Sequence, residues 1–145
     1  GILLSGPIGC GKTSVMNLMK HLTPVDHKFF IKPCRDISFE FIQDGYEIIH
    51  RYSKDRRSQS GPKTICFDDL GTESNLKYFG NECNVMAEIL LSRYELFTAR
   101  KLQTHITTNL SASEIEQVYG NRVRSRLRQL CNLVAYDKDA IDKRK

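Results

Sequence analysis

The residues from Gly6 to Thr13, GPIGCGKT, carry the first recognisable chemistry of this sequence. They match the phosphate-loop pattern, in which a glycine is followed by any four residues, then by Gly-Lys and a serine or threonine. Glycines let the backbone turn tightly, so that its N–H groups point at phosphate oxygens, and a helix N-terminus favours an anion. Lys12 is expected to reach the β- and γ-phosphates, and the Thr13 hydroxyl to bind Mg²⁺. We therefore predict binding of ATP and Mg²⁺, with the nucleotide held by Gly6, Pro7, Ile8, Gly9, Cys10, Gly11, Lys12, Thr13 and Ser14.

Polar residues follow two runs that are typical of strands. Asp68 and Asp69 come after Thr64–Phe67, and Asn109 comes after Thr104–Thr108. We expect Asp68 to bind Mg²⁺, usually through water, Asp69 to polarise the attacking water, and the Asn109 carboxamide to orient that water. Turns are the alternative at both places, because Asp and Asn also suit turns. The phosphate loop favours the metal-site interpretation for the aspartates and leaves Asn109 undecided.

Four arginines alternate with other residues late in the chain. At about 100° per residue, a helix here has one apolar stripe with two arginines on each flank. Arg122 and Arg126 lie on one flank, and Arg124 and Arg128 on the other. One pair could reach the γ-phosphate bound to a neighbouring subunit, and the other could contact nucleic-acid phosphates or surface carboxylates. A solvated amphipathic helix is the alternative.

The spacing of apolar residues predicts strands that alternate with helices. Strands are expected at Ile2–Leu4, Phe29–Ile31, Thr64–Phe67, Thr104–Thr108 and Leu133–Tyr136. Helices are expected at Ser14–Leu22, at Asp36–Tyr52 with Gly45 as a weak point, at Asn84–Ala99, after the capping box Ser111–Glu114, and around the arginines. This order predicts an α/β fold with a five-stranded parallel sheet covered on both faces, and a site at the carboxyl ends of the strands.

The first helix has the most regular apolar pattern. Its spacing predicts a buried stripe made of Val15, Leu18, Met19 and Leu22. Two other segments, Ser53–Pro62 and Gly71–Gly80, are polar and contain glycine, so the first is expected to be a loop and the second a polar connection.

The composition is that of an ordinary globular domain. The sequence has 145 residues, of which 40% are hydrophobic and 27% charged, so we expect one domain spanning residues 1–145. No apolar run approaches membrane-spanning length, and no cleavable signal is visible. The five cysteines lack C-x-x-C spacing, which favours reduced thiols in the cytoplasm over disulfides or zinc. Because the phosphate loop starts at residue 6, we also expect the chain to be part of a longer protein.

The net charge of +5 is modest, but the positive residues are clustered. Besides the four late arginines, Lys54, Arg56 and Arg57 lie mid-chain, and Lys143–Lys145 end the sequence. Partners rich in phosphate, above all single-stranded DNA, are consistent with this pattern, and solvated faces are the alternative for each cluster.

With these residues in view, the chain resembles the ATPase domain of the DnaC/IstB-like AAA+ proteins, a family of helicase loaders and transposition helper ATPases. The likeness covers nearly the whole chain and depends on four motifs in a fixed order. They are Gly6–Thr13 (GPIGCGKT), Phe67–Gly71 (FDDLG), Thr104–Ser111 (THITTNLS) and Tyr119–Leu127 (YGNRVRSRL).

The resemblance implies a phosphate-loop three-layer α/β sandwich and roles for particular residues. Asn109 matches the sensor residue of the family. Arg126 matches its arginine finger, with Arg122 as the nearest competitor. Since that finger acts on a neighbouring subunit, the resemblance implies self-association through ATP interfaces, on single-stranded DNA, with a replicative helicase as a further partner. Residues 34–60 correspond to a helical element that in relatives faces DNA.

Two departures from the family pattern are visible. Asp69 stands where many AAA+ proteins have glutamate, although the loader branch often has aspartate. The sequence also ends soon after the fifth strand, so no C-terminal helical lid is expected within it. A phosphate-loop small-molecule kinase, a transposition helper ATPase and a nucleotide-sensing module with little hydrolysis are the alternative functions.

Overall fold

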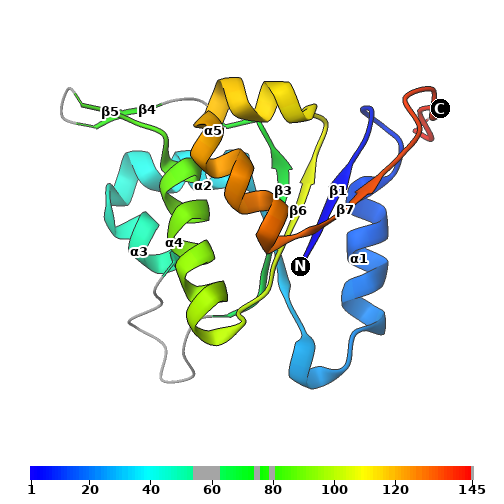
Figure 1. Cartoon of the computed structure of the whole chain (residues 1–145), viewed down its shortest axis with the longest axis horizontal. Coiled ribbons are helices and arrows are strands. Elements are labelled where there is room, and N and C mark those ends of the chain that lie inside the picture. Colours follow the sequence, from blue (N-terminus) through cyan, green and yellow to red (C-terminus); the bar gives the residue numbers. More distant parts are fainter. Residues whose placement is uncertain (54–62, 74–75, 79–80, 145) are drawn as a thin grey trace.

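The computed structural model describes residues 1–53, 63–73, 76–78 and 81–144. Its main sheet is five-stranded and all-parallel, in the order β2-β3-β6-β1-β7 (Figure 1). The strands are β1 (Ile2–Ser5), β2 (Phe30–Pro33), β3 (Ile65–Leu70), β6 (Thr104–Thr108) and β7 (Asn132–Ala135). The predicted five-stranded parallel sheet is therefore confirmed, and each strand begins and ends within three residues of its expected place.

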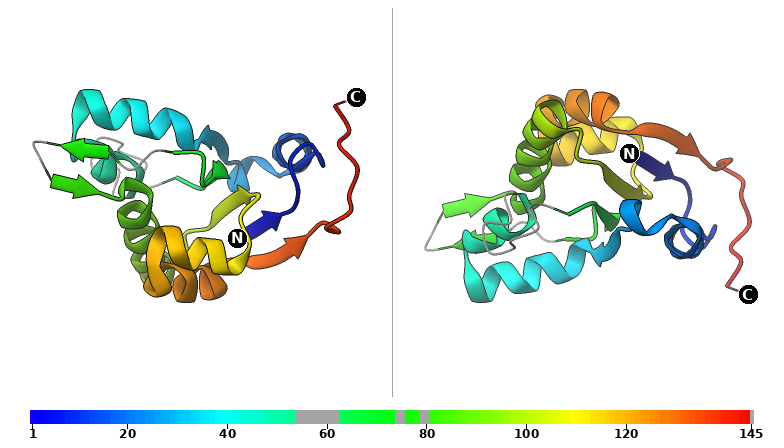
Figure 2. Two further views of the ribbon diagram at one scale, coloured as in Figure 1. Left: turned by 90° about the horizontal axis from the view of Figure 1, so that it is seen from above. Right: turned by 90° about the horizontal axis from the view of Figure 1, so that it is seen from below.

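Helices lie on both faces of this sheet, as Figure 2 shows from above and below. One face carries α2 (Cys34–Asp44), α3 (Glu47–Ser53), α4 (Val85–Arg100) and α5 (Ala112–Leu130). The opposite face carries α1 (Lys12–Leu22), which packs on β2 and β3 and is followed by a short 3₁₀ helix, η1 (Val25–His27). The fold thus has three layers, as expected.

Alternate residues of the strands serve the two faces, because side chains of a strand point to opposite sides in turn. Leu3, Phe67 and Ile106 belong to the larger core under α2–α5. The smaller core under α1 contains Leu4 and Cys66. Both faces are apolar, as a parallel sheet covered by helices requires.

Glycines divide two of the predicted helical regions. Gly45, with φ 60° and ψ −142°, ends α2 and separates it from α3, so the expected helical stretch is broken at its expected weak point. Gly120, with φ 86° and ψ 160°, interrupts α5 between its capped start and its arginines. The capping box is confirmed: the Ser111 hydroxyl accepts from the Glu114 N–H, and the Glu114 carboxylate accepts from the Ser111 N–H.

No strand was predicted within the polar connection Gly71–Gly80. A small antiparallel pair, β4 (Leu76–Tyr78) and β5 (Asn81–Cys83), begins within this segment. Strands of three residues are too short for hydrophobic periodicity to reveal them. The predicted loop Ser53–Pro62 lies almost entirely outside the described residues; Ser53 itself is the last residue of α3.

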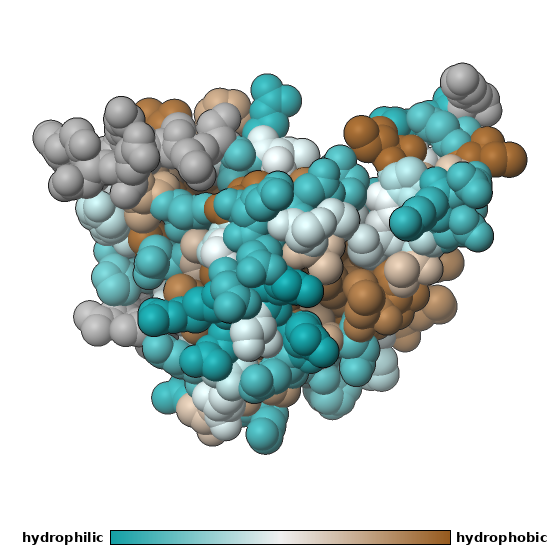
Figure 3. Space-filling view, turned by 45° about the horizontal axis from the view of Figure 1, so that its top comes forward, coloured by the Kyte–Doolittle hydropathy of each residue, from teal (hydrophilic) through white to brown (hydrophobic). Residues whose placement is uncertain are grey.

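The predicted buried stripe of α1 was wrong in part: Met19 is partly buried and packs against the smaller core, but the other predicted members are exposed. Met16 is fully buried, whereas Leu18 is 59% exposed and Leu22 75% exposed, and Val15 is exposed too. The phosphate loop decides the rotation of this helix: Lys12 must face the loop, so Met16, one turn later, faces the sheet. Apolar surface consequently lies on the side that carries α1 and β7 (Figure 3).

Candidate nucleotide site

The phosphate loop connects the end of β1 to the first turn of α1. Gly9 and Gly11 have φ of 81° and 97°, a left-handed conformation that suits glycine. The Lys12 ammonium lies inside the loop, where it donates to the carbonyl oxygens of Gly6, at 2.8 Å, and Pro7, at 2.9 Å. A lysine held among main-chain carbonyls at the start of a helix is placed to exchange them for phosphate oxygens.

The second motif meets the loop through a side-chain hydrogen bond. The Thr13 hydroxyl lies 3.0 Å from both carboxylate oxygens of Asp68, a residue of β3 that is buried. Hydroxyl and carboxylate oxygens are the ligands that Mg²⁺ prefers, and Mg²⁺ in phosphate sites takes one or two carboxylates together with phosphate oxygens. Thr13 and Asp68 therefore fit Mg²⁺ bound together with a nucleotide.

Because of a bulge in β3, the two aspartates point in different directions. Phe67 pairs with Ile106 and Leu70 with Thr108, so Asp68 and Asp69 together lie opposite the single residue Thr107. Asp69 has a φ of 55° and faces the outside, whereas Asp68 faces Thr13. Burial and the nearby Asp68 carboxylate raise the pKa of Asp69, while Lys12 and Arg144 lower it. A carboxylate with a raised pKa beside a phosphate loop is suited to general-base chemistry.

A cavity of about 290 Å³ lies at the carboxyl ends of the strands. Its lining comes from the phosphate loop, the end of β3, the end of β6 and the C-terminal segment. The lining residues are Ile8, Gly9, Gly11, Lys12, Thr13, Ser14, Asp69, Thr72, Asn109 and Arg144. The fold thus brings together Lys12, Asp69 and Asn109, the residues that the sequence analysis selected from three separate motifs.

Sequence reasoning missed two residues of this region. The C-terminal segment crosses the phosphate loop: the Lys143 N–H donates to the Gly9 carbonyl at 3.0 Å, and Arg144 reaches the cavity while it pairs with Asp142 at 3.1 Å. Arg144 had been grouped only with a terminal basic cluster, of which Lys145 lies outside the described residues. Thr107 bonds to both aspartates, and its only signal was its place near the end of β6, two residues before Asn109.

The four arginines of α5 do not line this cavity. The Arg126 guanidinium stacks on the Tyr94 ring of α4, and Arg122 is exposed. On the other flank, Arg124 forms an ion pair with Glu116 and borders, with Arg128, a second and more apolar cavity beside β7. The separation into two flanks agrees with the helical geometry. The mid-chain cluster Lys54, Arg56 and Arg57 lies outside the described residues.

Comparison with known proteins agrees with this geometry. The family model "ATPase family associated with various cellular activities (AAA)" matches residues 2–132. The chain belongs to this family. It is therefore a nucleotide-binding AAA ATPase, and the expected AAA+ fold is confirmed. No curated protein matches the sequence. Within the described residues, no helix has both the length and the apolar character needed to cross a membrane.

Solved structures of other AAA domains have the same fold. The crystal structure of the DnaC helicase loader matches with a TM-score of 0.65 and 17% identity, over 94% of this chain and 78% of that one. The crystal structure of DnaI matches with a TM-score of 0.61 and 21% identity, over 97% and 71% of the two chains. AMPPCP-bound DnaA from Aquifex aeolicus has a TM-score of 0.67 and 14% identity, over 94% of this chain and 39% of that one. The resemblance stated from the sequence is thus confirmed for the family and the fold.

Proposed function

We propose that this AAA domain binds ATP with Mg²⁺ at an interface between subunits, and that it acts as a helicase loader on single-stranded DNA. The proposal rests on one observation: the residues expected to act in hydrolysis lie in two separate places on the chain. Lys12, Asp69 and Asn109 border one cavity, whereas Arg122 and Arg126 lie on α5 and do not. A head-to-tail assembly would bring an arginine of one subunit to the cavity of the next.

Each residue then has a task that its position supports. Lys12 donates to phosphate oxygens in place of the carbonyls that it contacts in this structure. Thr13 and Asp68 hold Mg²⁺, which supplies charge neutralisation to the phosphates when it is bound. Asp69 accepts the proton of the attacking water, and the Asn109 carboxamide orients that water. Arg126 of the neighbouring subunit stabilises the charge that develops on the γ-phosphate, and Arg122 is the alternative candidate for this role.

The exposed surface of α2 is suited to binding single-stranded DNA. The Phe39 side chain is 54% exposed, and the Arg35 guanidinium lies 5.6 Å from the centre of its ring. An exposed aromatic ring beside an arginine is a platform on which a base can stack. These residues fall within the segment 34–60, which corresponds to a region that in relatives helps to form the surface facing DNA. The free cysteines suit a reducing compartment such as the cytoplasm.

A mixing experiment tests the shared site. Lys12→Ala and Arg126→Ala are each expected to abolish hydrolysis. The first variant cannot bind ATP, and the second cannot supply the arginine finger to the neighbouring subunit. An equal mixture should recover about a quarter of the wild-type rate, since random head-to-tail contacts pair an intact cavity with an intact finger in that proportion. No recovery, together with a wild-type rate per subunit that is independent of concentration, would contradict a shared site.

The DNA part of the proposal has a separate test. The ATPase rate per subunit of the wild type should rise with protein concentration and rise further with single-stranded DNA. Phe39→Ala should weaken DNA binding by about five- to a hundredfold, from the loss of one stacked base. Val25→Ala, which trims an apolar residue that is 79% exposed in η1, is the matched control. Equal DNA affinity of the Phe39 variant and the control would count against α2 as the binding surface.

A further inference from the structure

The hydroxyl of Thr107 joins the two aspartates of the nucleotide site. It donates to the Oδ1 atom of Asp68 at 2.7 Å and accepts from the N–H group of Asp69 at 2.8 Å. Thr107 has no solvent exposure, so water does not replace either bond. One buried side chain of β6 therefore contacts the expected metal ligand and the backbone of the expected base at once.

The bulge in β3 explains why a threonine is suited to this place. Two residues of β3 lie opposite Thr107, so the Asp69 N–H has no ladder partner on β6 and turns to the threonine side chain instead. Asp69 is also one of only two residues other than glycine with a positive φ in the described part of the chain. A conformation that is uncommon for aspartate persists only where its surroundings hold it. The bond from Asp69 to Thr107 is such a restraint.

We infer that Thr107 is a positioning residue for ATP hydrolysis, one that directs Asp68 toward Mg²⁺ and Asp69 toward the attacking water. This inference rests on the proposed roles of the two aspartates. Among the described residues, Thr13 is the other side chain that donates to Asp68, and its hydroxyl is the one expected to bind the metal. Thr107 is then the donor left to hold the Asp68 carboxylate in place.

The neighbouring threonines of β6 show what a purely structural role looks like. Thr108 is equally buried, but its hydroxyl donates to the Leu70 carbonyl at 2.7 Å and accepts from the Leu110 N–H at 3.1 Å. Thr104, at the other end of the strand, accepts from Arg93 at 2.7 Å. Neither bonds to a carboxylate of the site. Thr107 differs from both because its partners belong to the chemistry.

The test compares three variants of the full chain. Thr107→Val keeps the shape and removes the hydroxyl, Thr107→Ser keeps the hydroxyl, and Thr104→Val removes a buried hydroxyl far from the site. The readouts are the affinity for a fluorescent ADP analogue without Mg²⁺, the Mg²⁺ concentration at half-maximal binding of that analogue, and the single-turnover hydrolysis rate. Thermal unfolding of each variant measures the general loss of stability.

Thr107→Val is expected to bind nucleotide without Mg²⁺ like the wild type, but to need about 10- to 100-fold more Mg²⁺ and to hydrolyse ATP correspondingly more slowly. Thr107→Ser should return both values to within a few-fold of the wild type. Thr104→Val should lose stability and keep the wild-type Mg²⁺ midpoint. If Thr107→Val does not fold, Thr107→Cys takes its place under the same criteria, because a thiol is a weak donor and acceptor.

Two results would overturn the inference: a wild-type Mg²⁺ midpoint for Thr107→Val, or a serine variant as impaired as the valine variant. Asp68→Asn, measured in parallel, separates this failure from a failure of the proposed function. If Asp68→Asn responds to Mg²⁺ like the wild type, the metal-site assignment itself is wrong. If Asp68→Asn is impaired and Thr107→Val is not, only the role of Thr107 is wrong.

Discussion

The Arg126 guanidinium lies 4.5 Å from the centre of the Tyr94 ring, so the proposed finger of α5 rests on a side chain of α4. Tyr94 is itself held, since its hydroxyl donates to Gln129 at 2.6 Å. A cation over an exposed aromatic ring contributes about 0.5 to 1 kcal/mol. The contact therefore limits the positions of Arg126 while leaving it able to reach a neighbouring subunit.

We expect Arg126→Ala to bind ATP like the wild type and to lose about a thousandfold in assembly-dependent hydrolysis, the lower range for an arginine finger. Arg124→Ala is the matched control, because Arg124 lies on the other flank and pairs with Glu116. Nucleotide titration and turnover at saturating protein measure the two effects. Wild-type turnover of Arg126→Ala would move the finger to Arg122 or remove it from the mechanism.

The pH profile of hydrolysis should report the Asp69 carboxylate. Burial and Asp68 raise the pKa of Asp69, and the base works only when deprotonated, so the rate should fall on acidification at a higher pH than an ordinary aspartate would give. Arg144 lowers that pKa, so Arg144→Ala should move the acid limb of the profile to higher pH. Arg144→Lys, which keeps the charge, is the control. A downward shift in Arg144→Ala would contradict the assignment.

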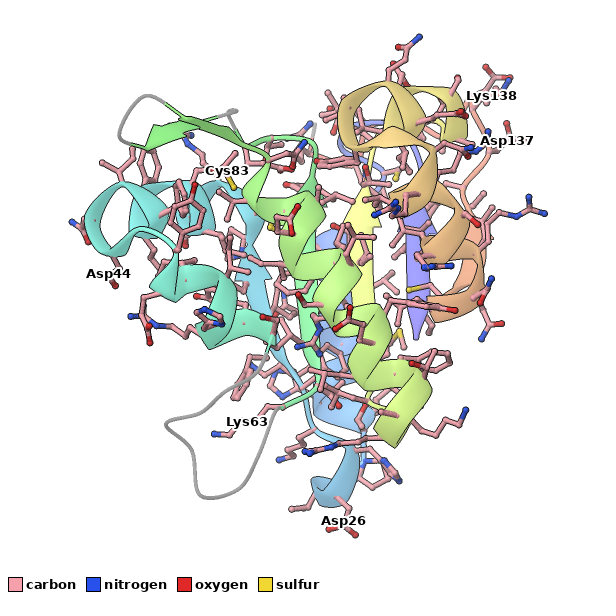
Figure 4. The ribbon with its side chains drawn as sticks, turned by 60° about the vertical axis from the view of Figure 1, so that its left-hand side comes forward. Asp26, Asp44, Lys63, Cys83, Asp137 and Lys138 are labelled. Carbon is pink, nitrogen blue, oxygen red and sulfur yellow. The ribbon has the colours of Figure 1, made fainter. Side chains whose placement is uncertain are left out.

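Arg93 should be a large contributor to stability. It is fully buried in α4, and it donates to the Thr104 hydroxyl and to the carbonyl oxygens of Tyr52, Lys63 and Gln103 at 2.7 to 3.0 Å. Burial lowers the pKa of Arg93 to about 10, which still leaves it charged at neutral pH. Lys63 lies near the end of the sheet away from Asp137 and Lys138 (Figure 4), so this cluster is remote from the nucleotide.

Arg93→Met is expected to reduce the free energy of unfolding by about 3 to 5 kcal/mol, because it leaves several buried acceptors without a donor. Arg100→Met, on the exposed last turn of the same helix, should change it by less than about 0.5 kcal/mol. Urea denaturation measures both. Similar values for the two variants would show that the buried network contributes little.

Stability should fall in mild acid because of His105. Burial lowers the pKa of His105 to about 4, and no hydrogen-bond partner for its Nδ1 atom is present among the described residues. As the pH falls from about 6.5 toward 4, the unfolded chain binds a proton that the folded chain does not, so the native state loses about 1 to 2 kcal/mol by about pH 5.

Chemical denaturation at about pH 7.5 and pH 5 measures this loss. His105→Phe should lose less stability between the two conditions, because the phenyl ring can keep the contact with Phe29, now 4.6 Å between ring centres, and does not titrate. Among the charges that also lower the pKa of His105, Arg93 stays protonated at both pH values. An equal loss in the variant would assign the acid sensitivity to other groups.

Two apolar residues of α1 should differ sharply in their effect on stability. Met16→Ala is expected to cost about 2 to 5 kcal/mol, because Met16 is fully buried against the sheet. Leu18→Ala should cost less than about 0.5 kcal/mol, since that side chain is 59% exposed. Thermal unfolding of the two variants decides between this rotation of α1 and the stripe that periodicity predicted. A larger cost for Leu18→Ala would support the periodicity.

Local patterns were sufficient for the five strands of the main sheet, for the longer helices and for the motifs. The phosphate loop, the capping box and the strand-ending aspartates are short contiguous segments, so backbone geometry and spacing identify them without knowledge of the rest of the chain. Alternation of strands and helices then limits the fold to a parallel sheet whose strands end at one edge, which explains why Lys12, Asp69 and Asn109 were expected at one site.

Tertiary structure decided what depends on rotation, register or distant contact. The apolar spacing of α1 is the same whichever face is buried, and the anchoring of Lys12 in the phosphate loop turned Met16 rather than Leu18 toward the sheet. The two bonds of Thr107 exist because a bulge changes the register of β3 against β6, and Arg144 reaches the cavity because the chain end crosses the phosphate loop. Such contacts join residues that are tens of positions apart, so no local pattern encodes them.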